Sequence, residues 1–393
     1  MKKIALIASL LLFLLIVVPY NQPVQGGELL TRTIYLIGDS SLIVGQNRIV
    51  AGDGSQQNPF LIKDLTITPL STHNGIVIIN ISKFVKLSNI MITGGINGIT
   101  IENSKNITVE KVTILNTSAS GIVLLGASNI KIDNATIKDI PYRGIYTNTN
   151  HFPEKTFGNS ITRSTIDNTG DSSILMFGNN TIISNNQVLN SKFRSIVVLS
   201  PFVNSVIADN YIENSQLEAI FAVGYQNLSI LPTIGKSADK STKLYIVNNE
   251  IKNMHEDGIE LLEGVSNSVV THNFIHDSPL ANSINFGHMN SLELFRNANN
   301  IELRHNIIAN TGGDPAKYAN GITIAQSPSN VVDSNSITNV PGFGVMIVWD
   351  DANWPIPQGN KITGNVVFNA KQLSVLNHVD SQDLVALNTI IFD

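Results

Sequence analysis

The sequence of 393 residues contains no cysteine and is poor in charged and aromatic side chains. Without cysteine, the chain can form neither disulfide bonds nor a metal site with thiolate ligands. Charged residues make up only 14% of the chain, against roughly 25% in an average soluble domain. The net charge of −5 at pH 7 gives no basic surplus that would attract nucleic acid or an anionic membrane surface. We therefore expect no nucleic-acid partner.

Long apolar runs are also absent after the first twenty residues. Lys2 and Lys3 precede an apolar run from Ile4 to Val18, which is short for a membrane span and typical of a secretory signal. We predict a signal peptide over residues 1–27, with cleavage near "VQGG" and no stable membrane insertion afterwards; a retained signal anchor is the alternative. The mature protein is expected outside the cell or at its surface, or in the periplasm of a double-membraned bacterium.

What the sequence does contain is two recurring phrases. The phrase "GI", followed by alternating apolar residues, begins at Gly75, Gly98, Gly121 and Gly144, 23 residues apart each time. Less regular copies begin at Ser173, Ser195, Ala219, Gly258, Ser283, Gly321, Gly344 and Ser374. The second phrase places Asn shortly before Ile, Val or Leu, from "DNATI" (133–137) to "LNTI" (387–390).

These phrases predict a β-solenoid. Short β-branched segments alternate with Asn, Gly and Ser turns, and no stretch has a sustained helical period. A period near 23 with about three short strands is typical of one coil of a parallel β-helix, in which coils stack about 4.8 Å apart. The recurring Asn predicts a column of side-chain amides that hydrogen-bond from coil to coil. The predicted fold is all-β, with about twelve coils.

The segment "AGDGSQQNPFLIKDLTI" (51–67) resembles the segment that precedes the first coil in exported β-helix repeat proteins. From about Val50 onward, the chain resembles the right-handed parallel β-helix (pectate-lyase-like) superfamily. More narrowly, it resembles exported repeat proteins related to the copper-site maturation proteins of denitrifiers. The resemblance implies a right-handed, single-stranded solenoid over residues 71–393, preceded by an N-terminal cap over 28–70. Because this fold hosts lyases, hydrolases, epimerases and adhesins, it does not determine the function.

The outward-facing positions of the coils carry the candidate site. In each "GI-x-I" the Ile side chains point inward and the residue between them points outward. This column and the residues just before "GI" become charged and aromatic in mid-chain. "MHEDGIELLEG" (254–264) repeats the strand of "SASGIVLLGAS" (118–128) with four carboxylates added. At a coil spacing of about 4.8 Å, Arg194, Glu218 and Asp257 should interact.

These residues suggest acid–base chemistry, and a solvated acidic turn is the alternative. We predict as catalytic candidates Asp257, Glu260, Glu218, Arg194 and His255. Two carboxylates could supply the acid and base of glycoside hydrolysis. A lyase or epimerase would need a base together with Arg or a cation. Glu218, Asp257 and Glu260 could hold calcium, the one cofactor that we consider.

Insertions along one edge of the coils predict a binding groove. They follow the "GI" strand at 147–160, 224–243, 287–300 and 349–360, and one precedes it at 311–320. Such insertions commonly form the walls of a groove, where aromatic rings can stack on sugars. The predicted substrate-binding residues are Arg143, Tyr146, Phe221, Asn285, Trp349 and Trp354. The expected partner is an extended polysaccharide.

Three functions remain open at this point. The first is a polysaccharide-binding protein, which, if catalytic, is a lyase, hydrolase or epimerase. The second is a non-catalytic structural or adhesive surface protein. The third is a metal-associated periplasmic maturation protein, although His272 and His305 occupy turn positions where any polar residue fits. The last strand, in "LVALNTIIFD" (384–393), predicts end-to-end self-association through its free edge.

Overall fold

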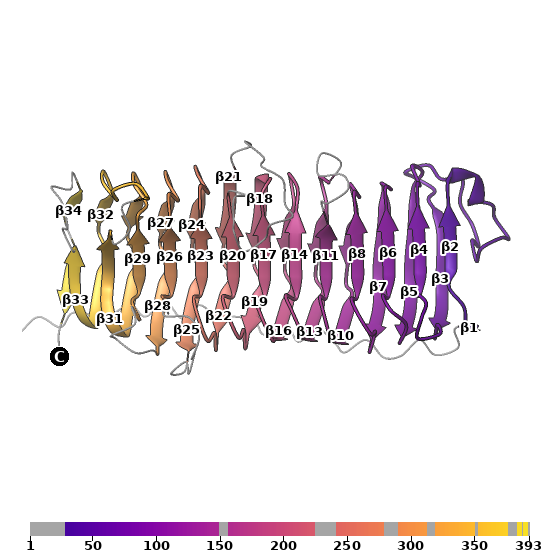
Figure 1. Cartoon of the computed structure of the whole chain (residues 1–393), viewed down its shortest axis with the longest axis horizontal. Coiled ribbons are helices and arrows are strands. Elements are labelled where there is room, and N and C mark those ends of the chain that lie inside the picture. The colour runs from indigo at the N-terminus through magenta and orange to yellow at the C-terminus, as the bar shows by residue number, and fades with distance from the viewer. Residues whose placement is uncertain are drawn as a thin grey trace, which may run out of the picture.

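The computed structural model describes residues 28–148, 156–224, 241–278, 290–312, 319–349, 353–375, 383–386 and 388–391. These residues form a rod of stacked coils in which each strand pairs in parallel with the equivalent strands of the neighbouring coils (Figure 1). Among them, the helical structure is one short 3-10 helix, η1 (Asp39–Ser41). None of their helical structure is long and apolar enough to cross a membrane. The predicted parallel β-solenoid is confirmed.

Each coil contributes one strand to each of three faces of the rod. The first face, which we call the GI sheet, contains the strands that begin with the "GI" phrase. It consists of β2 (Ile34–Ile37), β4 (Ile76–Ile79), β6 (Ile99–Glu102), β8 (Ile122–Leu125), β11 (Ile145–Asn148), β14 (Ile174–Phe177), β17 (Ile196–Leu199), β20 (Ile220–Val223), β23 (Ile259–Leu262), β26 (Leu292–Phe295), β29 (Ile322–Ala325) and the later parts of β31 (Ser336–Val348) and β33 (Val366–Val375).

The second sheet follows the GI sheet along the chain in each coil. It consists of the first parts of β3 (Phe60–Ile67), β5 (Val85–Thr93) and β7 (Ile107–Leu115), and of β9 (Lys131–Asp133), β12 (Ser160–Thr162), β15 (Ile182–Ser184), β18 (Val203–Ala208), β21 (Thr242–Val247), β24 (Val269–Thr271), β27 (Glu302–Arg304), β30 (Val331–Asp333), β32 (Lys361–Thr363) and β34 (Leu384–Ala386).

The third sheet completes each coil. It consists of β1 (Glu28–Leu30), the later parts of β3, β5 and β7, then β10 (Thr136–Ile140), β13 (Thr165–Thr169), β16 (Gln187–Ser191), β19 (Tyr211–Glu213), β22 (Glu250–Lys252), β25 (Phe274–Ser278), β28 (Ile307–Thr311), the first parts of β31 and β33, and β35 (Thr389–Ile391). Strands β1, β2 and β3 fall inside the predicted N-terminal cap, and the predicted signal peptide lies outside the described residues.

Columns of β-branched side chains fill the interior. Ile99, Ile122, Ile145 and Ile174 occupy the same position in successive coils and have no exposed surface. The "GI" glycine fits this close stacking, since a Cβ at Gly144 would lie 2.5 Å from the carbonyl oxygen of Ser173 in the next coil. Burial of aliphatic columns is the main favourable term, at roughly 25 cal/mol per Å² of apolar surface removed from water.

From Val77 to Met346, the pairing register confirms the predicted outward column except at one coil. Beyond it, Ser374, which was predicted to begin its strand, instead pairs with Met346 in the outward column. The exception within the column is the coil after β23. The sequence suggested Ser283 as the start of the strand after β23, with Asn285 pointing outward. The strand is instead β26, and Glu293 pairs with Glu260 in that column. The prediction failed because an insertion shifts the strand by eight residues, from Ser283 to Ser291, while "SINFG" resembles the repeat more closely than "SLELF" does.

A buried column of asparagines joins the coils at the corner between the second and third sheets. Each side-chain amide donates to the amide oxygen of the next coil at 2.9 or 3.0 Å, through Asn186, Asn210, Asn249, Asn273, Asn306, Asn335, Asn365 and Asn388. We call this the Asn ladder, and it confirms the predicted stack. The coil of "DNATI" is an exception, because Ala135 occupies the ladder position there and hydrogen-bonds through its backbone to Ser164.

The residue before each ladder Asn turns the corner. It adopts a left-handed backbone conformation with positive φ, as at Asn185, Asp209, Asn248, His272, His305 and Ser334. Asn, Asp and Gly reach this conformation at least cost, and a turn position exposed to water accepts other polar residues as well. The pairs "NN", "DN", "HN" and "SN" therefore encode a turn followed by a ladder amide.

Replacing a ladder residue should destabilise the rod locally. Asn273→Ala removes the acceptor of the Asn249 backbone N–H and the donor to Asn306, and it leaves buried polar groups unpaired. We expect the free energy of unfolding to fall by about 3 kcal/mol. Asn273→Ser, which copies the native Ser164, should recover part of this loss. Thermal unfolding and hydrogen exchange at the Asn249 amide measure both effects, and wild-type protection in the Ala variant would contradict the role of the ladder.

Candidate functional site

Stacking of the coils brings carboxyl side chains together on the outer side of the GI sheet. Some lie in the turns before β20 and β23, and others on the outward column of β23 and β26. They are Glu218, Glu256, Asp257, Glu260 and Glu293, with exposed fractions of 3, 8, 2, 7 and 2%. We call this set the acid cluster. Because nearly all of its surface is removed from water, its charges interact far more strongly than they would at an exposed turn.

Arg194 is the cation held against this cluster. Its Nε and Nη2 atoms donate to the two carboxylate oxygens of Glu218 at 2.6 and 2.8 Å. Its guanidinium group also lies over the rings of Phe221 and Phe193, at 4.1 and 4.6 Å from the ring centres. This bidentate geometry is the strongest arrangement of an arginine–carboxylate pair. These contacts agree with the predicted interaction of Arg194 with Glu218, and they do not include Asp257.

Burial raises the pKa of three carboxyl groups of the acid cluster. Burial, followed by the charge of Glu218, raises the pKa of Glu256 to about 8. Burial also raises the pKa of Asp257 and Glu260 well above their usual ranges, with further contributions from Glu293 and Glu218. Hydrogen bonding to Glu218 adds to the raised pKa of Glu256 and Glu260, and hydrogen bonding to Glu293 adds to that of Asp257.

Two buried polar atoms at the cluster have no hydrogen-bond partner within the described ranges. They are Oε2 of Glu256 and Nδ2 of Asn290, an acceptor and a donor. The other groups of Asn290 are occupied, because its backbone N–H donates to Asp257 and its Oδ1 accepts from the Thr323 hydroxyl at 2.6 Å. Unpaired groups at this depth are costly. A ligand that donates to one atom and accepts from the other would remove that cost.

Arginines between aromatic rings recur on the same face. Arg143 lies over Tyr142 and Tyr146, at 4.5 and 5.2 Å, and donates to Asp171 at 2.9 Å. Like Arg194, it lies in the turn before its GI strand. We call this group and that of Arg194 the Arg–aromatic stacks.

A third stack lies at the opposite end of the GI strands. There, Arg296 lies over Phe295 and Trp354, at 4.7 and 5.5 Å, and donates to Glu263 at 3.3 Å. We include it among the Arg–aromatic stacks. Aromatic and cationic groups therefore border the acid cluster at both ends of the strands.

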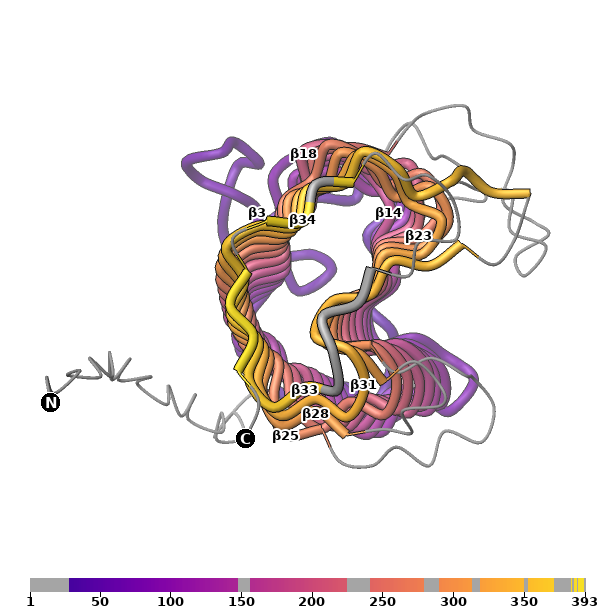
Figure 2. The backbone as a smooth tube through the Cα atoms, turned by 90° about the vertical axis from the view of Figure 1, so that its left-hand side faces the viewer, coloured from indigo at the N-terminus to yellow at the C-terminus, as the bar shows by residue number. Residues whose placement is uncertain are grey.

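Between these stacks, the outer surface of the GI sheet is apolar. A hydrophobic cluster separate from the interior of the rod contains Leu175, Phe177, Val197, Leu199, Phe221, Val223 and Leu262, with Tyr146 and Phe295 packed against it. The cross-section of the rod is indented on the side where β14 and β23 lie (Figure 2). The outward side chains of the GI sheet thus pack on one another instead of standing apart in water.

The structure gathers most of the predicted site residues on this one face. Arg143, Tyr146 and Phe221 belong to the Arg–aromatic stacks, and the predicted carboxylates belong to the acid cluster. Trp349 and Trp354 contact each other, since the Trp349 ring N–H donates to the Trp354 carbonyl at 3.3 Å. Asn285 lies outside the described residues, as does half of the predicted groove walls.

His255 was predicted as a catalytic residue, whereas Glu293 of the acid cluster was not. His255 is half-buried in the turn before Glu256, and its backbone N–H donates to the Ser215 carbonyl at 2.9 Å. Its ring makes no hydrogen bond or ion pair that is seen in the described part of the chain. Glu293 and Glu256 were not predicted. For Glu293, the signal was present in "LELF", which places Glu where "IELL" does.

The described residues give no geometric support for a metal centre. Within them, no group of three or more His, Asp or Glu side chains is placed to hold a metal ion. Calcium binding by Glu218, Asp257 and Glu260 therefore stays a prediction from the sequence. The rings of His272 and His305 lie 5.2 Å apart in successive coils, as their shared turn position requires.

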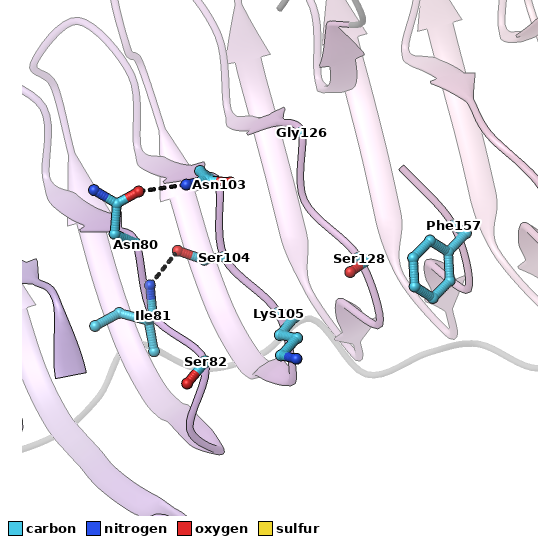
Figure 3. A pocket seen from close by; sticks show the side chains of 9 residues that line it. All are labelled: Asn80, Ile81, Ser82, Asn103, Ser104, Lys105, Gly126, Ser128 and Phe157. Atoms are coloured by element: carbon cyan, nitrogen blue, oxygen red, sulfur yellow. Dashed lines mark hydrogen bonds between the residues drawn. The ribbon is translucent and has the colours of Figure 1, made fainter. Parts of the chain in front are cut away.

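A pocket lies beside β4, β6 and β8 in the early coils, away from the acid cluster (Figure 3). Its lining is Asn80, Ile81, Ser82, Asn103, Ser104, Lys105, Gly126, Ser128 and Phe157. Asn103 donates to Asn80 at 2.5 Å, and the backbone N–H of Ile81 donates to the Ser104 hydroxyl at 2.9 Å. These polar groups already serve coil-to-coil bonding, so the pocket is weaker than the acid cluster as a candidate site.

The protonated carboxyls should make the protein less stable as pH rises. Between the unfolded pKa near 4.5 and the folded value of about 8, the folded Glu256 binds a proton that the unfolded residue has lost. The contribution of this proton to the free energy of unfolding is therefore fully present below the unfolded pKa. It is lost as the pH rises toward the folded pKa, at about 1.4 kcal/mol per pH unit for each retained proton. Melting temperatures measured from pH 5 to 8 should fall steadily.

A matched pair of variants checks the origin of this slope. Glu256→Gln keeps the size and hydrogen-bonding capacity of the side chain but cannot ionise, so it should flatten the decline. Glu302→Gln removes an exposed carboxylate on β27 and should leave the wild-type slope unchanged. Equal slopes in all three proteins would show that Glu256 does not retain its proton.

The comparisons with known proteins agree with this architecture. A model of the family "right handed beta helix region" matches residues 47–216 and 232–391. One similar solved structure is the A-module of mannuronan C-5 epimerase AlgE4 from Azotobacter vinelandii. It is 12% identical, with 92% of this chain and 91% of that chain covered and a TM-score of 0.58. No curated protein matches the sequence.

Two further solved structures have the same fold. PfbA, a surface adhesin of Streptococcus pneumoniae, is 15% identical, covers 83% of this chain and 84% of its own, and has a TM-score of 0.60. The periplasmic alginate epimerase AlgG is 12% identical, with 91% and 83% covered and a TM-score of 0.58. At these identities, the likeness concerns the fold alone. Because the family model spans most of the sequence, this chain belongs to the right-handed β-helix family.

Proposed function

We propose that the protein binds an extended polysaccharide along the outer face of the GI sheet, centred on the acid cluster. The observation that carries this proposal is the row of Arg–aromatic stacks. Tyr142 and Phe193 keep 43% and 37% of their surface exposed, and each supports an arginine that is held in place by a carboxylate. Aromatic faces bury the C–H surface of a sugar ring, and planar charged groups hydrogen-bond its hydroxyls.

The repeating architecture supports a polymeric ligand. A solenoid presents equivalent surfaces at a fixed spacing, which suits a chain of repeating units. Structures with a similar fold include a mannuronan C-5 epimerase, a periplasmic alginate epimerase and an α-1,3-glucanase in complex with tetrasaccharides. Export to the cell surface, the medium or the periplasm belongs to the same proposal. The relationship to copper-site maturation proteins and the end-to-end association of rods stay predictions.

Proton transfer to the bound polymer is the second candidate function, and it rests on the carboxyl pairs. The pKa of Glu256 is raised to about 8 and that of Glu260 is also raised, beside Glu218, which is ion-paired with Arg194. Groups whose environments separate their protonation states are suited to act as acid and base. However, hydrogen-bonded carboxyls lie closer than the ~5–9.5 Å that separates the pair in glycosidases. The geometry therefore favours binding, and after binding it favours proton transfer over hydrolysis by these pairs.

Removing an exposed aromatic ring should weaken polysaccharide binding. We expect Phe193→Ala and Tyr142→Ala each to raise the Kd about tenfold, which corresponds to about 1.4 kcal/mol of lost stacking. Tyr245→Ala is the matched control, since Tyr245 is 39% exposed but lies on β21 of the second sheet. Affinities would be measured across a panel of acidic and neutral polysaccharides. Equal losses in all three variants would contradict a site on the GI face.

If the bound polymer is processed, the acid cluster should be required. Glu260→Gln and Asp257→Asn should lower turnover by about 10²-fold or more, while Glu302→Gln should have no effect. Reducing ends and the absorbance of unsaturated products would be followed with and without calcium. Binding without turnover in the wild type would assign the protein to the binding or adhesive class instead.

A further inference from the structure

We propose that the polysaccharide bound at the acid cluster is electrically neutral, not a polyuronate. This inference rests on the proposed function and specifies its substrate class. It starts from the balance of charge on the described part of the face. The carboxyl groups of the acid cluster and the Arg–aromatic stacks are Asp171, Glu218, Glu256, Asp257, Glu260, Glu263 and Glu293, and the cations are Arg143, Arg194 and Arg296.

Each of these arginines already has a carboxylate partner. Arg143 pairs with Asp171 at 2.9 Å, Arg194 with Glu218 at 2.6 Å, and Arg296 with Glu263 at 3.3 Å. Every cation of the stacks is thus neutralised within the protein. Lys192, next to Phe193, is exposed, and water and salt screen its charge. The stacks therefore offer a polyanion no uncompensated positive charge.

A polyuronate carries a carboxylate on every sugar ring. At this face, each would add a negative charge beside five buried carboxyl groups that are held against a single arginine, Arg194. Glu260 and Glu293 face each other across adjacent strands with exposed fractions of 7 and 2%. Screening by salt reaches buried charges only weakly. A polyuronate would therefore bring negative charge to a place where each arginine of the stacks is already paired, and uncompensated charge in a binding site strongly suppresses the wrong partner.

The unpaired atoms at the cluster lead to the same conclusion. Oε2 of Glu256 can accept a hydrogen bond or, when the carboxyl is protonated, donate one, and Nδ2 of Asn290 requires an acceptor. A sugar hydroxyl both donates and accepts, so it fits either state. An ionised carboxylate only accepts, so it could bond to Glu256 only while that residue is protonated. The hydroxymethyl group of a neutral sugar therefore matches both atoms in either protonation state of Glu256, and the carboxylate that replaces it in a uronic acid does not.

Chemically matched polymers test this inference. Carboxyl reduction converts a polyuronate into the neutral polymer with the same backbone linkage, so each pair differs only in charge. The panel contains several polyuronates beside their reduced forms and several natural neutral glycans. For any pair that binds, we expect the neutral member to bind at least about tenfold more tightly, with an affinity that changes little from low to high salt.

A variant links the preference to the cluster. Glu260→Gln/Glu293→Gln removes carboxylates while keeping side-chain size, and it should narrow the difference within a pair several-fold by improving polyuronate binding. Glu302→Gln should leave the difference unchanged. Circular dichroism confirms that each variant is folded, and Glu260→Gln alone replaces the double variant if that one is not.

The outcomes separate this inference from the proposed function. Tighter binding of the polyuronate, weakened by salt, would overturn the neutral-substrate inference and leave polysaccharide binding intact. If the double variant kept the full wild-type preference for the neutral polymer, the inference would also be overturned, because the preference would then arise outside the acid cluster. Failure of every polymer in the panel to bind would overturn the proposed function and this inference together.

Discussion

The parallel hydrogen-bonding register between coils is the constraint on which the rest of this structure depends. It places equivalent residues of successive coils about 4.8 Å apart, so a single position in the repeat becomes a column. Each column therefore repeats one kind of side-chain interaction from coil to coil. Aliphatic side chains bury one another, and amides such as Asn249 and Asn273 hydrogen-bond in series. Carboxylates in a column repel, and Glu293, which pairs with Glu260, adds to the burial and the Glu218 charge that raise the pKa of Glu260.

The sequence predicted which positions repeat from coil to coil better than it predicted which residues of the acid cluster occupy them. The spacing of "GI" and of the paired Asn encodes a backbone that repeats, and local turn chemistry at positions such as Asn248 reinforces it. The acid cluster was found only in part, because its last member follows an insertion that breaks the period. Glu256 was missed for a different reason. Its importance comes from burial in a turn, and no feature of "HEDG" distinguishes a buried turn from a solvated one.

The protonation of the acid cluster is a consequence of packing, not of the residue types alone. Four carboxylates in "HEDGIELLE" would all ionise on an exposed turn. Here Glu218 of the preceding coil and Glu293 of the following coil lie against them, and Arg194 compensates for a single charge. Proton uptake is the cheaper alternative to burying several like charges. The cluster therefore destabilises the fold at neutral pH, which is expected where function and not stability has selected the residues.

The Asn ladder offers a physical explanation of how the rod tolerates this destabilisation. In a solenoid, stability is approximately a sum over coils and their interfaces, so a loss in one coil is offset by its own and adjacent interfaces. The coils that carry the acid cluster also carry Asn249, Asn273 and Asn306, on the far side of the interior. The early coils have no such amides, since β5 and β7 run through the same corner as continuous strands. The ladder thus strengthens coil-to-coil bonding in the part of the rod where the acid cluster weakens it.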